Sequence, residues 1–257
     1  MRRVRFLSAS VSAAVLTGSM LAASGAPVLA AVVHHPRIAA RPLSNLGWAS
    51  SNWSGYARTA GAPYTTATAQ WKVPSVARSR KATYDSQWLG IDGFNNSSLI
   101  QTGTETDYYN GAAHYNAWWE ILPAAETPIS SITVHPGDLM TASIAKGSGG
   151  KWTITIKDVT TNQSFSTSQS YSGPGSSVEW IEEAPTVGGR QATLATYSSP
   201  DLFDPGTANG GNPGLTAADG GAMIQGGRQV STPSAPDGDK DGFNMAYGST
   251  APAAPGS

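Results

Sequence analysis

Two segments of the sequence place polar groups that could do chemistry inside otherwise apolar, strand-like patterns. Gln101 follows Leu99 and Ile100, and Glu183 closes the segment 178–183. Burying such groups costs free energy unless they are paired or used. A glutamine amide can polarise a carbonyl, and a carboxylate can take a proton from a water molecule. Together the two side chains favour an enzyme that adds water to a carbonyl.

Several familiar catalytic chemistries are absent from the sequence. The chain has no cysteine, which excludes cysteine nucleophiles and thiolate metal sites. Neither Gly-x-Ser-x-Gly nor His-Glu-x-x-His occurs, and the only histidines after residue 48, His114 and His135, match no catalytic motif. Aspartic proteases use two Asp-Thr/Ser-Gly loops, whereas residues 101–103 read Gln-Thr-Gly and have no second copy.

One acidic motif near the end of the chain has two interpretations. Asp237-Gly-Asp239-Lys-Asp241-Gly242 resembles the first half of a calcium-binding loop. The closing glutamate of such a loop is missing, because position twelve is Gly248. We therefore interpret the motif as a turn between the last two strands.

The positioning elements are predicted to be short strands, because no stretch sustains a helical period and Gly, Asn and Ser turns are frequent. An Asn110-Gly111 pair predicts a hairpin, and 204–221 is expected to be a long surface loop. Strands at this spacing predict an antiparallel β-sandwich or barrel. The expected strands are 65–73, 84–92, 139–145, 152–158, 164–171, 178–183, 191–197, 222–230 and 243–247.

Alternation along these strands separates two faces, since alternate residues of a strand share a side of the sheet. Leu89 with Ile91 and Val178 with Trp180 are expected on the core face. The other face suits substrate binding, because it gathers aromatic and polar groups: Trp88, Asp92, Gln101, Glu105, Trp118, Glu120, Glu179 and Glu183.

The N-terminal region predicts processing. Residues 1–30 combine a basic start, an apolar stretch too short to span a membrane and small residues at a cleavage position, which indicates a signal peptide; an uncleaved anchor is the alternative. Residues 31–48 carry Arg37, Arg41 and two histidines but no acid, which we interpret as a pro-segment, with a disordered tail as the alternative. Residues 49–257 suffice for one domain.

Charge is distributed unevenly along the chain. Five of the 16 Lys and Arg residues precede residue 49, which leaves 11 against all 17 acidic residues. No basic patch is present for nucleic acid. With every carboxylate protonated, the residual positive charge is modest for this size, so the composition permits tolerance of acid.

Five segments share residues and order with a known family. They read Ser51-Asn-Trp53-Ser-Gly, Trp88-x-Gly-Ile-Asp92-Gly, Leu99-Ile-Gln101-Thr-Gly103, Ala117-Trp-Trp-Glu120 and Glu179-Trp-Ile-x-Glu183. In these motifs, from about residue 51 to 248, the chain resembles the secreted glutamic peptidases, or eqolisins. The resemblance implies an all-β, antiparallel two-sheet sandwich of concanavalin or jelly-roll type. It also implies endopeptidase activity at acid pH, a Gln/Glu dyad, a removable pro-segment, and no metal or other cofactor.

Site residues follow from the resemblance motif by motif. Gln101 matches the catalytic glutamine, which would stabilise the oxyanion, and Glu183 the catalytic glutamate, which would activate water and then protonate the leaving amine. Positions that line or support the cleft are matched by Trp53, Trp88, Asp92, Glu105, Trp118 and Glu120. Glu182 departs from the pattern, because an apolar residue is expected there, so it lies near a strand end or the register is shifted by one.

We expect a secreted, extracellular monomer that acts on polypeptides and binds neither nucleic acid nor, after signal cleavage, a membrane. Two alternatives remain: a carbohydrate-binding sandwich with Trp88, Trp118 and Trp119 as a sugar platform, and a glycoside hydrolase that uses Glu120 and Glu183. The pro-segment is expected to cover the acidic cleft at neutral pH, held by Arg37 and Arg41, and to leave on acidification.

Overall fold

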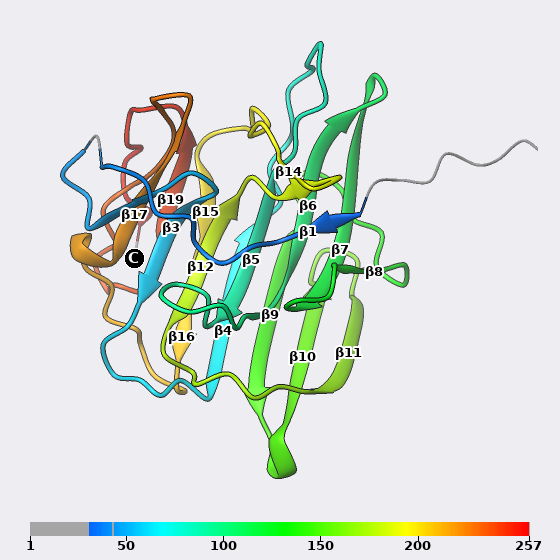
Figure 1. The fold of residues 1–257 in the computed structure, drawn as a ribbon, viewed down its shortest axis with the longest axis vertical. Helices are drawn as coiled ribbons and strands as arrows, with labels where there is room; N and C mark the ends of the chain where they lie inside the picture. Colours follow the sequence, from blue (N-terminus) through cyan, green and yellow to red (C-terminus); the bar gives the residue numbers. More distant parts are fainter. Residues whose placement is uncertain (1–30, 43, 257) are drawn as a thin grey trace, which may run out of the picture.

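The computed structural model describes residues 31–42 and 44–256, and nearly all of its regular structure is β-strand (Figure 1). The predicted signal peptide, residues 1–30, lies outside the described residues. No helix among the described residues is long and apolar enough to cross a membrane.

Two layers of antiparallel strands face each other. The first layer pairs in the order β3 (Trp53–Arg58), β12 (Val178–Glu183), β5 (Ser86–Ile91), β6 (Ile100–Tyr109), β7 (Ala112–Ile121) and β8 (Thr127–Ile129). The second layer contains β4 (Thr66–Lys72), β9 (Leu139–Lys146), β10 (Lys151–Asp158) and β11 (Gln163–Ser170). These bounds agree with an antiparallel sandwich, as the sequence predicted.

Four strands carry the pairing from one layer to the other: β15 (Asp201–Phe203), β17 (Gly220–Gln225), β18 (Arg228–Pro233) and β19 (Phe243–Tyr247). The remaining elements are short: β1 (Val32–Val33), β2 (Trp48–Ser50), β13 (Thr186–Val187), β14 (Arg190–Gln191), β16 (Thr207–Ala208), and the 3-10 turns η1 (Ser148–Gly150) and η2 (Ala217–Asp219). β1, β13 and β14 form a small separate sheet.

The main core lies between the layers. Leu89 and Ile91 of β5 pack with Trp71 of β4 and Ile144 of β9 in one buried cluster. Trp71 also donates its indole hydrogen to Thr104 Oγ1 of β6 at 2.9 Å, which joins the layers. The alternation predicted for β5 is therefore correct, and its other face is free to carry the polar residues.

Two predicted strands are wrong. Segment 222–230 is a hairpin of β17 and β18, because Gly226 and Gly227 both adopt positive φ (57° and 74°) and reverse the chain. Segment 191–197 has only two-residue β14 and isolated bridges at Leu194 and Tyr197. The central strand β3 was not predicted, because it is buried on both faces and lacks alternation.

Candidate active site

Cross-strand register brings the predicted polar residues to one face of the first layer. Gln101 of β6 lies opposite Glu120 of β7. Glu105 of β6 lies opposite Ser86 of β5, which in turn lies opposite Glu183 of β12. Directly opposed residues project to the same side, and so do residues four apart on one strand. These five polar groups therefore share one face of the sheet in two adjacent cross-strand lines, which together we call the row.

Gln101 is fully buried and bonded to its cross-strand partner. Its Nε2 donates to Glu120 Oε2 at 2.6 Å, and its Oε1 has no partner among the described residues. Burial, reinforced by the charge of Glu183, raises the pKa of Glu120 to about 8, although His34 and Gln101 oppose the shift. The Glu120 carboxyl therefore fixes the orientation of the Gln101 amide.

Glu183 presents a fully buried carboxylate held by several donors. Its Oε2 accepts from Trp88 Nε1 at 2.9 Å, and its Oε1 accepts from Asn52 Nδ2 at 3.4 Å. Asn52 directly precedes β3, which pairs with β12. The carboxylate is thus positioned by neighbours on both sides of its strand.

Three tryptophans at predicted positions form the floor of this face. Trp53 packs edge-on against Trp88, with ring centroids 4.9 Å apart, and both are fully buried. Trp118 donates to Ser86 Oγ at 3.1 Å. Gly103 lets this packing occur, because a Cβ there would lie 2.5 Å from Trp88 Cβ. The indoles therefore position Glu183 and Ser86.

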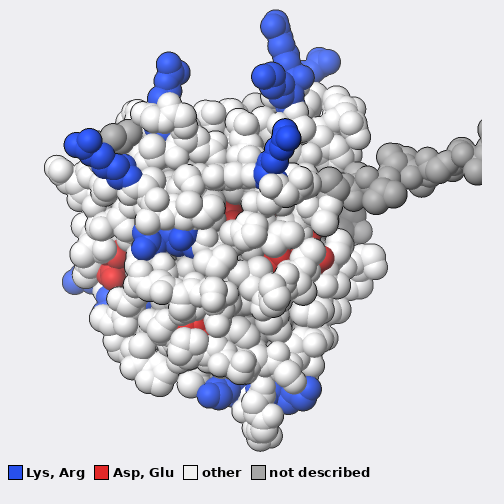
Figure 2. Space-filling view, in the orientation of Figure 1, with Lys and Arg blue, Asp and Glu red and all other residues white. Residues whose placement is uncertain are grey.

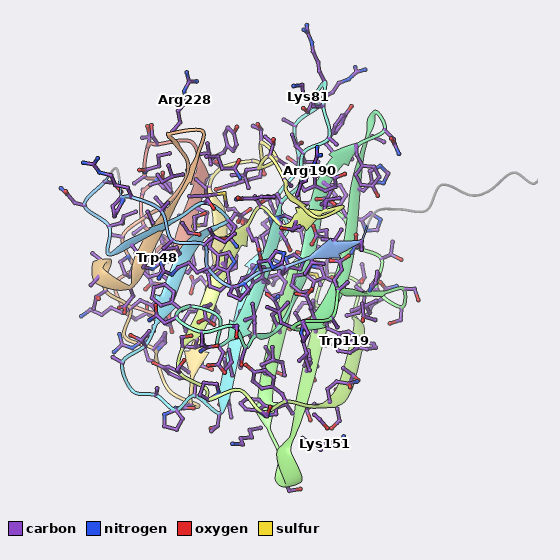
Figure 3. The ribbon with its side chains drawn as sticks, viewed as in Figure 1. Trp48, Lys81, Trp119, Lys151, Arg190 and Arg228 are labelled. Atoms are coloured by element: carbon purple, nitrogen blue, oxygen red, sulfur yellow. The ribbon has the colours of Figure 1, made fainter. Side chains whose placement is uncertain are left out.

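The tryptophans do not form a sugar platform. Trp88 and Trp118 are fully buried, and Trp119 packs against the main core on the other side of β7. Figure 3 shows Trp119 and Trp48 on opposite sides of the molecule. The carbohydrate-binding alternative needs all three rings on one face, so the position of Trp119 on the other side of β7 does not support it.

Asp92 supports the face from one end and stays outside the row. It follows β5 with a positive φ of 73°. Its carboxylate accepts hydrogen bonds from Tyr171 Oη at 2.7 Å and from the backbone of Gly175 and Ser176 at 2.9 and 2.8 Å. Asp92 thus ties the loop before β12 to the end of β5.

A segment of the chain itself occupies the face. The leader segment, residues 31–42, starts beside β7 and β6 and runs across β5 and β12 (Figure 1). Its strand β1 pairs with β13, directly after β12. Figure 2 shows only small areas of Asp and Glu atoms on this side of the molecule, with Lys and Arg projecting around the rim.

His34 of the leader segment is the residue that enters the row of carboxylates. It is fully buried, and its ring stacks on Trp118 with centroids 3.9 Å apart and an interplanar angle of 8°. Its Nδ1 lies 3.0 Å from Glu183 Oε2. Its Nε2 lies 3.3 Å from Glu126 Oε2 and 3.0 Å from Glu105 Oε1.

This geometry requires a protonated imidazole. A neutral ring has one donor nitrogen, whereas both His34 nitrogens face carboxylate oxygens. The Glu105 oxygens make no aligned hydrogen bond, so Glu105 acts through its charge and Glu126 is the acceptor. Burial lowers the pKa of His34, but the carboxylates of Glu183, Glu105 and Glu126 outweigh burial and hold it well above the ordinary value.

The backbone of the leader segment completes the contact. The His35 amide donates to Glu183 Oε1 at 3.2 Å, and the His34 amide donates to Glu120 Oε1 at 3.3 Å. Asn52 Oδ1 accepts a hydrogen bond from the Ile38 amide at 2.8 Å. Both oxygens of Glu183 are therefore occupied by the leader segment.

The prediction that Arg37 and Arg41 hold the segment on the carboxylates is wrong. Arg37 lies beyond the row, where its guanidinium donates to the Phe94 carbonyl at 3.1 Å and lies over the Phe94 ring. Arg41 is exposed and makes no ion pair within the described ranges. The cation that meets the acids is His34, whose ring stacks on Trp118 and pairs with Glu105 and Glu183.

Glu105 sits at the far end of the row. Burial and the nearby Glu126 raise its pKa to about 7, against the opposing effect of His34. A cavity of about 580 Å³ opens beside it, and its lining includes Tyr84, Asp107 and Glu126. His34, Glu105 and Glu126 also bring potential metal-ligand atoms within 4.8 Å of one another. The cavity leaves room for a further side chain next to the leader segment.

Glu182 points to the opposite side of β12, as alternation predicted, so the register is correct. It lies in a second group of buried carboxyls, which we call the carboxyl cluster: Asp85, Glu182 and Asp201. Gln87 Nε2 donates to Asp85 at 2.9 Å and to Glu182 at 2.8 Å. Burial, followed by mutual repulsion for Asp85 and Asp201, raises the pKa of all three carboxyls.

Sequence reasoning placed Gln101, Glu105, Glu120 and Glu183 correctly together but missed the groups that approach them from other elements. His34 and Asn52 bond to Glu183, and Ser86 lies within the row between Glu105 and Glu183. A carboxylate oxygen of Glu126 lies within 4.8 Å of one of Glu105. Only Asn52 had a signal, because it lies within the Ser51-to-Gly55 motif.

Comparisons with known proteins agree with this geometry. A family model described as the Peptidase A4 family matches residues 51–245. Aspergillopepsin-2 of Aspergillus niger is 28% identical over 187 residues, which are 63% of this chain and 66% of that protein. Scytalidopepsin B of Scytalidium lignicola is 35% identical over 127 residues, 49% of this chain and 47% of that protein. The alignments thus span at most 66% of these relatives' lengths.

Solved structures share the fold. Scytalido-glutamic peptidase with a transition-state analog inhibitor superposes with a TM-score of 0.65 over 77% of this chain and 98% of that chain. Aspergilloglutamic peptidase from Aspergillus niger gives a TM-score of 0.55 over 64% and 99%. Both are 24% identical to this chain, so they show the fold alone.

Proposed function

The chain belongs to the peptidase A4 family, the glutamic peptidases or eqolisins, and on that premise we propose that it is a secreted endopeptidase that acts at acid pH. One observation carries the proposal: Gln101 and Glu183 project from one face of the sheet, and an extended peptide of the same chain lies across them. The His35 amide at 3.2 Å from Glu183 supports the idea that peptide backbones bind there.

In the proposed reaction Glu183 takes a proton from a water molecule whose oxygen bonds to the substrate carbonyl carbon. The Gln101 amide carries two hydrogens, so it can keep its bond to Glu120 and donate the second to the oxyanion. When the carbon–nitrogen bond breaks, Glu183 returns its proton to the leaving amine. The products are a carboxylic acid and an amine, and Glu183 is again a carboxylate.

Acid action is supported by the number of buried carboxyls that hold protons. The pKa of Glu105 is raised to about 7 and that of Glu120 to about 8, in both cases first by burial. The carboxyl cluster is also buried, and four of its six oxygens have no hydrogen-bond partner among the described residues. Such carboxyls are tolerated in the fold when they are protonated.

A pH dependence of stability follows from these raised values. Unfolded carboxyls release protons near pH 4, whereas the folded ones keep them to higher pH, so the stabilisation is complete below about pH 4 and is lost as pH rises through the folded pKa values. Each such carboxyl contributes a slope of up to about 1.4 kcal/mol per pH unit. Urea unfolding of the Glu183→Gln chain, measured from acid to neutral pH, should show the free energy of unfolding decreasing.

The variant Asp201→Asn should flatten that slope, because it removes one proton-binding group from the carboxyl cluster. Asp158→Asn is the matched control: Asp158 is buried too, but its carboxylate is satisfied by Thr161. An unchanged slope in Asp201→Asn, or stability that rises towards neutral pH, would contradict this explanation.

We further propose that residues 1–30 are a signal peptide, that 31–48 form a pro-segment and that 49–257 are the peptidase domain. The leader segment supports this division, because His34 occupies Glu183 Oε2 and the His35 amide occupies Oε1. A base that is bonded in this way has no position for a water. Export to the extracellular space, polypeptide substrates and a monomeric state remain part of the proposal, with no role for nucleic acid or, after signal cleavage, for a membrane.

Acid would release the leader segment by protonating the carboxylates that hold His34. The groups that face His34 are Glu105, Glu120, Glu126 and Glu183, from β6, β7, the β7–β8 connection and β12. Their attraction for an imidazolium requires ionised carboxylates. Acidification protonates these carboxylates and removes the attraction, while His34 stays protonated.

Replacing His34 should therefore make the full chain active without exposure to acid. At about pH 6, His34→Ala is expected to hydrolyse a fluorogenic peptide at least about tenfold faster than the wild type, since a buried charged hydrogen bond is lost. Initial rates measured directly after purification at neutral pH provide the test.

His35→Ala is the matched control, because only the backbone of His35 is bonded to the site in the described part of the chain. It should stay as latent as the wild type. If His34→Ala is equally latent, or if both variants are activated equally, His34 does not block the base.

A further inference from the structure

Three carboxylates far from the cleft gather where the β15 strand ends. Asp204 follows β15, while Asp237 and Asp241 lie in the turn between β18 and β19. One oxygen from each can be chosen so that all three lie within 4.8 Å of one another. The acidic motif at 237–242 therefore does not stand alone, because the fold adds a carboxylate from a distant part of the sequence.

Asp237 shows that the group is incomplete. It is only 6% exposed, and its Oδ1 accepts the amides of Lys240 and Asp241 at 2.7 and 3.1 Å. Its Oδ2 is buried and has no hydrogen-bond partner among the described residues. A buried carboxylate oxygen without a donor is costly, so a missing partner is expected at this atom.

The unpartnered oxygen and the carboxyl group of Asp204 border the same space beside Gly242. A Cβ placed on Gly242 would lie 2.5 Å from Asp237 Oδ2 and 2.7 Å from Asp204 Cγ. The space that glycine leaves open is thus bordered by both carboxyl groups. A larger residue at position 242 would fill it.

Among the described residues, no positive side chain forms an ion pair with this group. Burial and the repulsion of neighbouring aspartates raise the pKa of both Asp204 and Asp241. Three mutually repelling carboxylates at this distance create a strong preference for a small, multiply charged cation.

We propose that Asp204, Asp237 and Asp241 bind a calcium ion that fastens the 204–219 loop to the β18–β19 turn. All three donors are hard oxygens, as Ca²⁺ requires, and waters can complete its six to eight ligands. The loop already contacts the turn at three places: Gly206 N to Asp241 O at 2.8 Å, Leu215 N to Lys240 O at 2.9 Å and Asn212 Nδ2 to Asp239 O at 2.7 Å. In a chain without cysteine, the ion would cross-link two segments as a disulfide does elsewhere, although by ionic coordination and not by a covalent bond.

The test is a thermal unfolding measurement on the full chain at neutral pH, with CaCl₂ against EDTA and with NaCl to match ionic strength. For a site of extracellular strength, saturating Ca²⁺ should raise Tm by about 3–10 °C. Isothermal titration calorimetry with CaCl₂ should show one ion per chain. The wild-type result does not depend on peptidase activity, so it can fail while the proposed function stands.

Two variants assign the site. Asp237→Asn and the half-buried Asp204→Asn should both lose the calcium-dependent rise in Tm; the second keeps the test valid if Asp237→Asn does not fold. Asp138→Asn is the control, since Asp138 also accepts a backbone amide in a turn but belongs to no carboxylate group of this kind among the described residues. Absence of calorimetric binding in the wild type, or an equal rise in Tm in Asp204→Asn, would overturn the proposal.

Discussion

Glu183→Gln is expected to fold normally and to lose peptide hydrolysis by about 10³–10⁴-fold, because an amide cannot accept the proton of the attacking water. Gln keeps the shape of Glu, and its oxygen can still accept from Trp88 Nε1. The rate is measured with a fluorogenic peptide at acid pH after the leader segment has been removed by an added protease.

Glu182→Gln is the matched control, one residue away on the opposite face of the same strand. Its carboxyl accepts from Gln87 inside the carboxyl cluster, and Gln preserves that volume without a charge. It should retain most of the activity. If Glu182→Gln is inactive and Glu183→Gln is active, the assignment of the base is wrong.

Gln101→Ala is expected to lower kcat by about 10²–10³-fold while changing KM much less. The oxyanion forms only on the way to the transition state, so its donor contributes little to binding of the ground state. Steady-state kinetics at acid pH separate the two constants. The substitution also frees Glu120, whose Oε2 loses the 2.6 Å hydrogen bond from Gln101.

Trp118→Ala provides the contrast, since Trp118 offers a flat surface on which the ring of His34 stacks. A loss of that surface should raise KM. If Gln101→Ala and Trp118→Ala change kcat and KM in the same proportion, Gln101 belongs to a binding surface rather than to the oxyanion site.

The sequence predicted the strands whose two faces differ. β12 and β19 have the predicted bounds, and the alternation around Glu182 and Glu183 sends one carboxyl to each side of the sheet. The strand β3 was missed because five of its six residues are buried, which leaves no polar face to reveal a period of two. The predicted strand 222–230 includes the adjacent glycines 226 and 227, although these two residues form a turn.

The site was predicted where strand register alone determines it. Gln101, Glu105, Glu120 and Glu183 lie on paired or successive strands, so alternation was enough to place them together. His34 could not be found in this way, because it enters from a segment with no regular period. Counting charges favours Arg37 and Arg41, whereas the contact with the acids is made by His34, whose ring stacks on Trp118.

The acidic motif at 237–242 is a second case in which a distant segment of the chain completes a site. The motif at 237–242 lacks the final glutamate of a calcium loop, so the sequence favoured a turn. The third carboxylate comes from Asp204, which strand pairing of β15 with β19 brings near. Such a contact depends on tertiary structure and leaves no local signal.

The most direct test of the Gln/Glu dyad is the hydrolysis of an acid-denatured protein by the acid-treated chain, with and without a statine-type transition-state inhibitor of aspartic proteases. Because an amide replaces one of the two carboxyl groups that such an inhibitor addresses, the wild type should release peptides at the same rate in both samples. The Glu183→Gln chain should release none and should keep its leader segment by intact mass. Complete inhibition of the wild type, or peptide release by Glu183→Gln, would contradict the dyad.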